Sequence, residues 1–270
     1  MNNATLVAHQ GWADFFSINA LYNNYAKKFD HVIIFVSDEK RKFFLEECLY
    51  HIKNIEILVP IWRQFSSEMD TCLVCHTVGH FSHCPRDIGS RCKFIDYSNY
   101  PDRTHIKIGA FNNYNKWEKH MRNELSFSHA FFTYENKNLA SRIDDFSIYF
   151  DESKNDSAYR DIVSSIGKDY LVIHDDISRG LLLCDDVLEK EVPIVNLNMR
   201  SETLIDQIGI LENSRQLHFI DSSYAVLIYF MSFHNDKIKN IPKFLHVDRY
   251  RQRDIGIYKY PTPDNWSIVL

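Results

Sequence analysis

Short apolar runs that stop abruptly at polar residues constrain the fold of this chain more than any other feature. Residues 32–36 (VIIFV) and 170–174 (YLVIH) are nearly continuous apolar segments rich in Val and Ile. Segments of this kind predict strands, and residues 170–174 are typical of a strand buried on both faces of a parallel sheet. Since parallel strands must be joined by crossovers, helices should alternate with these strands along the chain.

The first half of the chain shows this alternation. Its predicted elements are strands at residues 6–8, 32–36, 55–59 and 105–108, and helices over residues 15–29, 117–121 and 127–134. Ser37 is expected to cap the helix that follows the second strand, because a serine hydroxyl can accept a free N–H of the first helical turn. Residues 61–104 are irregular, polar and rich in cysteine, and are interpreted as an insertion.

The second half repeats the pattern. Its predicted elements are strands at residues 146–150, 170–174, 193–195 and 216–220, and helices over residues 156–166, 204–211 and 222–233. The chain is therefore predicted to be an α/β protein with two Rossmann-like lobes, residues 1–139 and 140–270. Right-handed crossovers would place ligands beyond the carboxyl ends of the parallel strands.

Composition excludes several other classes of protein. With 45% hydrophobic and 25% charged residues among 270, the chain has the values of an ordinary globular protein. A formal charge of −5 provides no broad positive field for nucleic acid or an anionic membrane. No apolar stretch is long enough to span a membrane and no signal peptide is evident, so we expect a cytoplasmic protein. The abundance of Asn, Lys, Tyr, Phe and Ile suggests an AT-rich genome, such as that of a large DNA virus or a low-GC microbe.

Polar residues cluster where three predicted strands end. The three clusters are residues 9–14 (HQGWAD), 174–180 (HDDISRG) and 218–223 (HFIDSS). In an α/β sheet these positions lie at the edge where ligands bind. They are therefore the candidate binding residues of this chain.

Two of these clusters suit a phosphate. Ser222 and Ser223 open a helix, whose free N–H groups and positive dipole end favour an anion. Arg179 has the fork of donors that matches phosphate oxygens, and Gly180 would let the backbone approach a ligand. The alternatives are that Asp221 or Ser222 only caps its helix and that Arg179 only pairs with nearby carboxylates, namely Asp175 or Asp176. His174 and His218 could contact a ligand or serve the structure alone.

The first cluster contains two candidate bases. Asp14 could accept a proton from a hydroxyl group, and His9 is the rival for that role. Asp14 equally suits the first turn of its helix, where a carboxylate meets the positive dipole end. Gly11 is expected to serve the turn, with Trp12 beside it.

A cluster of cysteines in the insertion raises the question of a metal. Cys72 and Cys75 form a C-x-x-C pair, followed by histidines and by Cys84 and Cys92. Thiolate and imidazole ligands at short spacing are typical of structural zinc, but the second pair is too widely spaced for a second knuckle. Buried, unligated thiols are the alternative. No catalytic metal or other cofactor is expected.

Taken together, these motifs resemble the short GT-B-like glycosyltransferases of large DNA viruses and bacteria, which are distantly similar to ADP-heptose and fucosyl transferase folds. The resemblance is carried by loose motifs in a common order: residues 6–14, 131–134, 142–146, 170–176, 217–223 and 264–266. One departure is Ala13, where related proteins often have a second glycine in the first loop.

The resemblance implies a metal-independent glycosyltransferase with two parallel sheets facing a central cleft. The C-terminal lobe would hold a nucleotide-sugar donor through residues at its strand ends, and the N-terminal lobe would bind a glycan or other hydroxyl acceptor. The implied donor residues are His174, Asp175, Arg179, His218, Asp221, Ser222 and Ser223. The alternatives are a non-catalytic nucleotide- or sugar-binding protein of the same fold and a zinc-organised interaction module.

Overall fold

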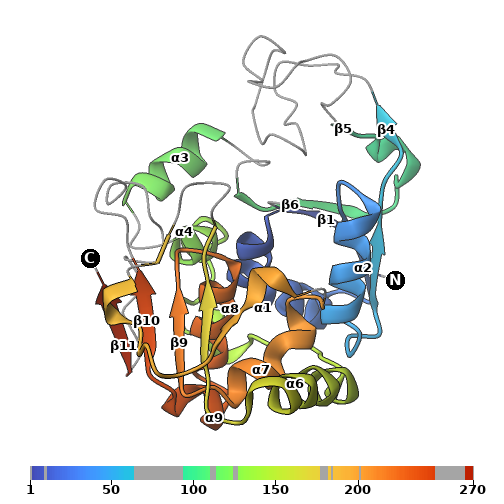
Figure 1. The fold of residues 1–270 in the computed structure, drawn as a ribbon. Helices are drawn as coiled ribbons and strands as arrows, with labels where there is room; N and C mark the ends of the chain where they lie inside the picture. Colours follow the sequence, from blue (N-terminus) through green and yellow to red (C-terminus); the bar gives the residue numbers. More distant parts are fainter. Residues whose placement is uncertain are drawn as a thin grey trace. The chain divides into compact units, whose positions relative to one another are not determined.

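A computed structural model describes most of the chain, which is divided into two compact units. The described residues are 2–8, 11–63, 94–109, 114–123, 127–176, 182–183, 185–200, 202–246 and 265–269. The units are Met1–Tyr149 and Phe150–Leu270, and each contains its own parallel sheet (Figure 1). The boundary lies later than the one predicted between residues 139 and 140. The two parallel sheets with their connecting helices confirm the predicted α/β class.

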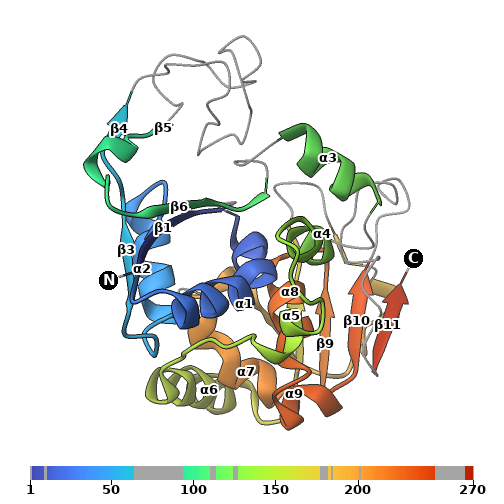
Figure 2. The ribbon, with the colours of Figure 1, turned by 180° about the vertical axis from the view of Figure 1, so that it is seen from behind.

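The first unit is built on a four-stranded sheet in the order β3-β2-β1-β6, with every neighbouring pair parallel. Its strands are β1 (Asn3–Val7), β2 (His31–Phe35), β3 (Ile55–Leu58) and β6 (Thr104–Lys107). Its helices are α1 (Trp12–Lys28), α2 (Glu39–Cys48), α3 (Tyr114–Asn123), α4 (Phe127–Tyr134) and α5 (Ser141–Asp144). Figure 2 shows α1 packed along one face of this sheet. Two further short strands, β4 (Trp62–Arg63) and β5 (Phe94–Ile95), form a separate antiparallel pair.

The residue that begins α2 differs from the predicted one. Asp38, rather than Ser37, is the N-cap, and its carboxylate accepts the backbone N–H of Arg41 at 3.0 Å. The Ser37 hydroxyl donates to the Asp38 carboxylate at 2.7 Å and so supports the cap from outside the helix. Both residues can cap helices, and the carboxylate has the advantage of its charge at the positive dipole end.

Residues 146–150 do not form the predicted strand. Their backbone groups are bonded elsewhere: Ser147 N–H donates to Asn19 Oδ1 at 2.8 Å, and Tyr149 N–H donates to the carbonyl of Cys48 at 2.7 Å. The carbonyl of Asp145 accepts Asn23 Nδ2 at 2.7 Å. Because two side chains of α1 and a backbone carbonyl at the end of α2 bond this segment, it needs no neighbouring strand. The same bonds attach it to the first unit.

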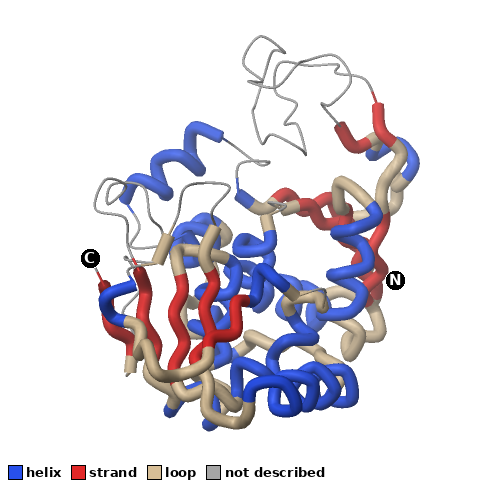
Figure 3. The backbone as a smooth tube through the Cα atoms, in the orientation of Figure 1, coloured by secondary structure: helices blue, strands red, loops and turns tan. Residues whose placement is uncertain are grey.

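The second unit is built on a five-stranded parallel sheet in the order β11-β10-β9-β7-β8 (Figure 3). Its strands are β7 (Leu171–His174), β8 (Ile194–Asn196), β9 (Gln216–Phe219), β10 (Lys243–His246) and β11 (Trp266–Val269). Its helices are α6 (Glu152–Ile166), α7 (Ile208–Glu212), α8 (Ser223–Met231) and α9 (Asp236–Asn240). Numbered within the unit, the strand order is 2-1-3-4-5, a doubly wound arrangement.

Helix α8 is the core helix of the second unit. Every residue from Tyr224 to Met231 is buried, and none of them is charged. A helix that is apolar all round must be covered on all sides, so the apolar sequence of this segment alone places it inside the unit. Its first residues consequently stand in a defined position at the carboxyl end of β9.

Candidate functional site

The order of strands places the first polar cluster at a topological switch point. β1 lies between β2, which follows it in the chain, and β6, which comes much later. The connections from the carboxyl ends of such neighbouring strands diverge and leave a crevice where ligands of α/β proteins bind. Gly11, Trp12 and Asp14 follow β1 and therefore lie at this switch point. His9, the rival candidate base, lies outside the described residues.

Asp14 is the most unusual acid of this rim. Its carboxylate accepts the backbone N–H of Gly11 at 3.1 Å, which is one half of a capping box at the start of α1, since Gly11 has no side chain to form the other half. Burial raises the pKa of Asp14 to about 7, against the opposing effect of the Gly11 N–H, which favours the ionised form. The side chain is nevertheless partly exposed. A carboxyl group that is half ionised near neutral pH can take up a proton and release it again.

Gly11 makes room for that carboxylate. Its backbone angles, φ −72° and ψ 150°, are open to any residue, so the turn itself does not require glycine as predicted. A β-carbon at this position would lie 2.7 Å from Asp14 Oδ2. The glycine is therefore explained by the close approach of the carboxylate to the backbone.

Trp12 belongs to an aromatic and charged cluster on the same rim. Its ring packs edge-on against Phe44 with 4.4 Å between centroids, and the Arg41 guanidinium lies 5.8 Å from its ring centroid. Arg41 in turn forms a short ion pair with Asp38, the cap of α2. Asp38 and Arg41 were not among the predicted site residues, although Asp38 lies two residues after the end of a predicted strand. Trp12 remains partly exposed beside Asp14.

The other two polar clusters meet at the switch point of the second sheet. β7 lies between β8 and β9, and the chain passes from β7 to β8 on one side before it returns to β9 on the other. His174 is the last residue of β7, and Ser222 and Ser223 follow β9. Ile220 N–H donates to the carbonyl of His174 at 3.2 Å, so the two strand ends are directly joined.

Ser222 and Ser223 have different positions at the start of α8. Ser222 is the N-cap, with its hydroxyl accepting the N–H of Ala225 at 3.5 Å, and only 7% of its surface is exposed. Ser223 is the first helical residue and is partly exposed. The capping alternative therefore holds for Ser222, and Ser223 presents the more accessible hydroxyl. Asp221, just before them, is also partly exposed.

The residues at and just after the end of β7 are held by neighbouring elements. The buried His174 ring lies 4.5 Å from the Tyr224 ring of α8, between centroids. Asp175 accepts Asn198 Nδ2 at 2.8 Å, and Asn198 follows β8. These contacts fix the rim from two sides. Arg179 and Gly180, the predicted phosphate contacts of this loop, lie outside the described residues.

His218 lies within the sheet rather than at its rim. The side chain is fully buried, and both ring nitrogens have protein partners: His246 Nε2 at 3.0 Å and Gln216 Oε1 at 3.1 Å. Its ring stacks on Phe244 at 4.5 Å between centroids. Burial, with the neighbouring His246, lowers the pKa of His218 to about 4, so it is neutral at physiological pH. These contacts indicate a structural role, and contact with a donor stays a prediction.

The four clustered cysteines of the insertion do not belong to the part of the chain that the structure describes. Cys72, Cys75, Cys84 and Cys92 lie outside the described residues, so the predicted zinc site stays a prediction. Cys48, at the end of α2, is buried and forms no disulfide within the described residues. Within the described ranges, no group of three or more His, Cys, Asp or Glu side chains is arranged to hold a metal ion. No helix in the described part of the chain has the length and apolar character needed to cross a membrane.

Comparison with known proteins yields one structural likeness. No protein-family profile matches the chain, and no curated protein sequence matches it. The chain is similar to the crystal structure of the glycosyl transferase family 9 protein from Veillonella parvula, with 10% identity and a TM-score of 0.46 over 99% of this chain and 85% of that one. A likeness of this strength carries no argument about activity.

Proposed function

We propose that this protein is a GT-B-type glycosyltransferase that moves a sugar from a nucleotide-diphosphate donor to a hydroxyl group of a glycan or other acceptor. The observation that carries the proposal is Asp14, a carboxyl group with a pKa of about 7 at the switch point of a parallel sheet. Strongly perturbed acids in such positions are typical of catalytic sites. The resemblance of the sequence motifs to glycosyltransferases supports the same conclusion.

In the proposed reaction Asp14 acts as the general base. The acceptor hydroxyl transfers its proton to the Asp14 carboxylate as its oxygen bonds to the anomeric carbon of the donor sugar. The bond from that carbon to the diphosphate oxygen breaks, and the nucleoside diphosphate leaves with the electron pair. A base with a pKa near the working pH combines a useful ionised fraction with a strong affinity for the proton. His9 is the alternative base.

The proposed donor site belongs to the second unit. Negative charge grows on the diphosphate as it leaves, and the start of α8 offers free backbone N–H groups and the Ser223 hydroxyl to that charge. Arg179 is proposed to add its guanidinium, with His174, Asp175 and Asp221 contacting the remainder of the donor. Because a helix terminus and an arginine supply this stabilisation, the proposed reaction needs no metal. The first unit would then hold the acceptor beside Trp12 and Asp14.

A panel of nucleotide-sugars tests this function. The melting temperature of the purified protein should rise with one class of nucleotide-sugar, because a ligand that binds only the native state stabilises it by mass action. The same donor should release its nucleoside diphosphate slowly in water and faster with an acceptor present. Asp14→Asn should keep the thermal shift and lose the release.

Three results would contradict the proposal. A thermal shift without release of nucleoside diphosphate from any donor would identify a non-catalytic binder of the same fold. If no nucleotide-sugar shifts the melting temperature, the donor site is wrong. Stoichiometric zinc in the purified protein, together with a loss of stability in Cys75→Ala, would instead favour the zinc-organised interaction module.

A further inference from the structure

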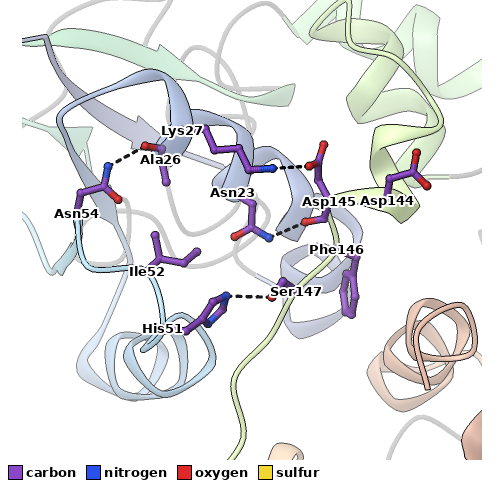
Figure 4. Close-up of a pocket in the computed structure, with 10 residues that line it drawn as sticks. All are labelled: Asn23, Ala26, Lys27, His51, Ile52, Asn54, Asp144, Asp145, Phe146 and Ser147. Atoms are coloured by element: carbon purple, nitrogen blue, oxygen red, sulfur yellow. Dashed lines mark hydrogen bonds and ion pairs between the residues drawn. The ribbon is translucent and has the colours of Figure 1, made fainter. Parts of the chain in front are cut away.

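A pocket of about 360 Å³ lies in the first unit, at the far end of α1 from Asp14 (Figure 4). It is lined by Asn23, Ala26, Lys27, His51, Ile52, Asn54, Asp144, Asp145, Phe146 and Ser147. Its volume falls within the range of small-molecule sites. Asn23 stands nine residues after Asp14 on the same helix, a separation of about 13 Å at 1.5 Å per residue. The pocket is therefore distinct from the proposed transfer site.

One side chain of this pocket has an unused acceptor. Asn23 is 7% exposed, and its Nδ2 donates to the carbonyl of Asp145 at 2.7 Å and to Asn19 Oδ1 at 3.2 Å. Because two acceptors face Nδ2, the orientation of the amide is determined by its bonds. Asn23 Oδ1 is buried and has no hydrogen-bond partner among the described residues. Figure 4 shows this oxygen on the side of the amide that faces away from Asp145.

A buried acceptor without a partner calls for an explanation, since nearly all such groups in native proteins are bonded. The position of the Asn23 side chain is explained by its Nδ2, which donates to the carbonyl of Asp145 at the end of α5. That bond does not account for Oδ1. Asn23 lines the pocket, and its Oδ1 is enclosed in this conformation, so the side chain must shift before a ligand can reach the oxygen. A ligand with an N–H or O–H group would complete it.

The remaining lining indicates which ligand fits. Lys27 Nζ and Asp145 Oδ1 form an ion pair at 2.5 Å, so the pocket presents a donor and an acceptor side by side. His51 Nε2 lies 3.0 Å from the Ser147 hydroxyl, and burial together with Lys53 lowers the pKa of His51, which favours its neutral form. Ala26, Ile52 and Phe146 supply apolar surface. Since both charges are already paired, neither an anion nor a cation is strongly favoured.

We propose that this pocket binds a small neutral polyhydroxylated ligand of monosaccharide size. One hydroxyl donates to Asn23 Oδ1, others exchange hydrogen bonds with the Lys27–Asp145 pair, and the carbon skeleton packs on Ile52. The wall formed by residues 144–147 belongs to the segment that leads out of the first unit, so a bound ligand would brace that segment. This site does not depend on the proposed sugar transfer.

Protein NMR with D-glucose as the probe tests the site. Titration at millimolar concentrations should produce saturable shifts of the backbone amides that line the pocket and of the Asn23 side-chain amide. Asn23→Leu, which removes the acceptor, should weaken binding at least tenfold. Ile52→Trp, at a half-buried position on the wall, should block the pocket while leaving Asn23 in place, and it serves if Asn23→Leu fails to fold. Asp14→Asn should bind D-glucose here as the wild type does, whatever its transfer activity.

Three outcomes would overturn the proposal. The first is the absence of saturable shifts with D-glucose. The second is equal binding by wild type, Asn23→Leu and Ile52→Trp. The third is a stronger response of the same residues to ethylammonium chloride or sodium phosphate, run as parallel titrations, because either would assign the pocket to a charged ligand.

Discussion

The two switch points of this molecule differ in how far the protein satisfies its own polar groups. At the second, the Ser222 hydroxyl caps α8 and Asp175 accepts a hydrogen bond from Asn198. At the first, burial raises the pKa of Asp14 to about 7 while the Gly11 N–H only partly compensates. A rim with satisfied side chains presents a rigid surface for binding. A rim with a poorly solvated carboxyl group is prepared for proton transfer.

This difference suggests a division of labour in which the first unit supplies the proton acceptor and the second holds the departing group. If it is correct, substitutions in the first rim should change the rate, and substitutions in the second should change affinity for the donor. Each of the following variants tests one side of that comparison.

The largest effect is expected for Asp14→Asn, which keeps the shape of the side chain and removes its basicity. Loss of a general base typically lowers the rate about 10²–10⁴-fold. We expect kcat to fall by that factor in a nucleoside-diphosphate release assay, and the dissociation constant of the donor to stay within about twofold. In the wild type the rate should rise with pH through about 7 as Asp14 ionises. An unchanged rate would exclude Asp14 and direct attention to His9.

Arg179→Ala is expected to change affinity for the donor at the rim of the second unit, rather than the rate. Removing a charged hydrogen bond to phosphate should weaken affinity for nucleoside diphosphate by roughly 1.5–3 kcal/mol. Calorimetric titration with the diphosphate measures this directly, and Arg200→Ala, which removes an arginine paired with Glu202, is a matched control in the same unit. Equal affinity of Arg179→Ala and wild type would reject Arg179 as a donor contact.

Asp14→Asn should also change the pH dependence of stability. The folded-state pKa of about 7 lies above the ordinary value of 3.8, so the native state binds the proton more tightly than the unfolded state does. Stability of the wild type should therefore fall as pH rises from about 4 to 7. Relative to the wild type, the Asp14→Asn variant should gain on the order of 1–3 kcal/mol at pH 8 and nothing near pH 4. Urea unfolding at both pH values measures the difference.

Gly11→Ala should disturb the position of the carboxylate without disturbing the turn. The new β-carbon would lie 2.7 Å from Asp14 Oδ2, so the carboxylate must move away from the Gly11 N–H. We expect kcat to fall about tenfold, because misplacing a catalytic group by a fraction of an ångström already slows the reaction. The melting temperature should change little, since φ is ordinary for alanine. A normal rate would show that the carboxylate position is not critical.

Ser222→Ala should have the smallest effect. Its cap bond is long, 3.5 Å, so the loss of stability should lie near the lower end for cap removal, about 0.5–1 kcal/mol. Donor affinity should remain nearly the same, because this hydroxyl is largely buried. Ser223→Ala is the matched comparison, with a partly exposed hydroxyl that should affect donor affinity more than stability. The reverse pattern would exchange the proposed roles of the two serines.

Much of the fold could be predicted because most of its strands coincide with short apolar segments of the sequence. Residues 32–36 and 216–220 match β2 and β9 to within one residue. The prediction failed where tertiary contacts decide: backbone N–H groups of residues 146–150 are bonded by Asn19 and by the carbonyl of Cys48. No local pattern shows that such polar groups will find partners.

Part of the candidate site could also be predicted, because its polar residues come at the ends of the apolar strand segments. Asp14, His174, Ser222 and Ser223 were identified as residues at strand ends, and the structure places them at the two switch points. The involvement of Asp38 and Arg41 at the first rim was missed, although Asp38 also follows a strand. Nothing in the sequence distinguished the buried position of His218 from a rim position, because the apolar pattern does not show at which residue β9 ends.

The sequence by itself determined the alternation of strands and helices and the polar residues that follow each strand, since both depend on side chains close together in the chain. Only the tertiary structure decided the order of strands, the pKa of Asp14 and the unused acceptor of Asn23. Strand order depends on pairings between distant segments, and desolvation and hydrogen bonding depend on everything that surrounds a group. The candidate site residues could therefore be identified from the sequence, but their pKa values and hydrogen bonding depend on surroundings that only the fold provides.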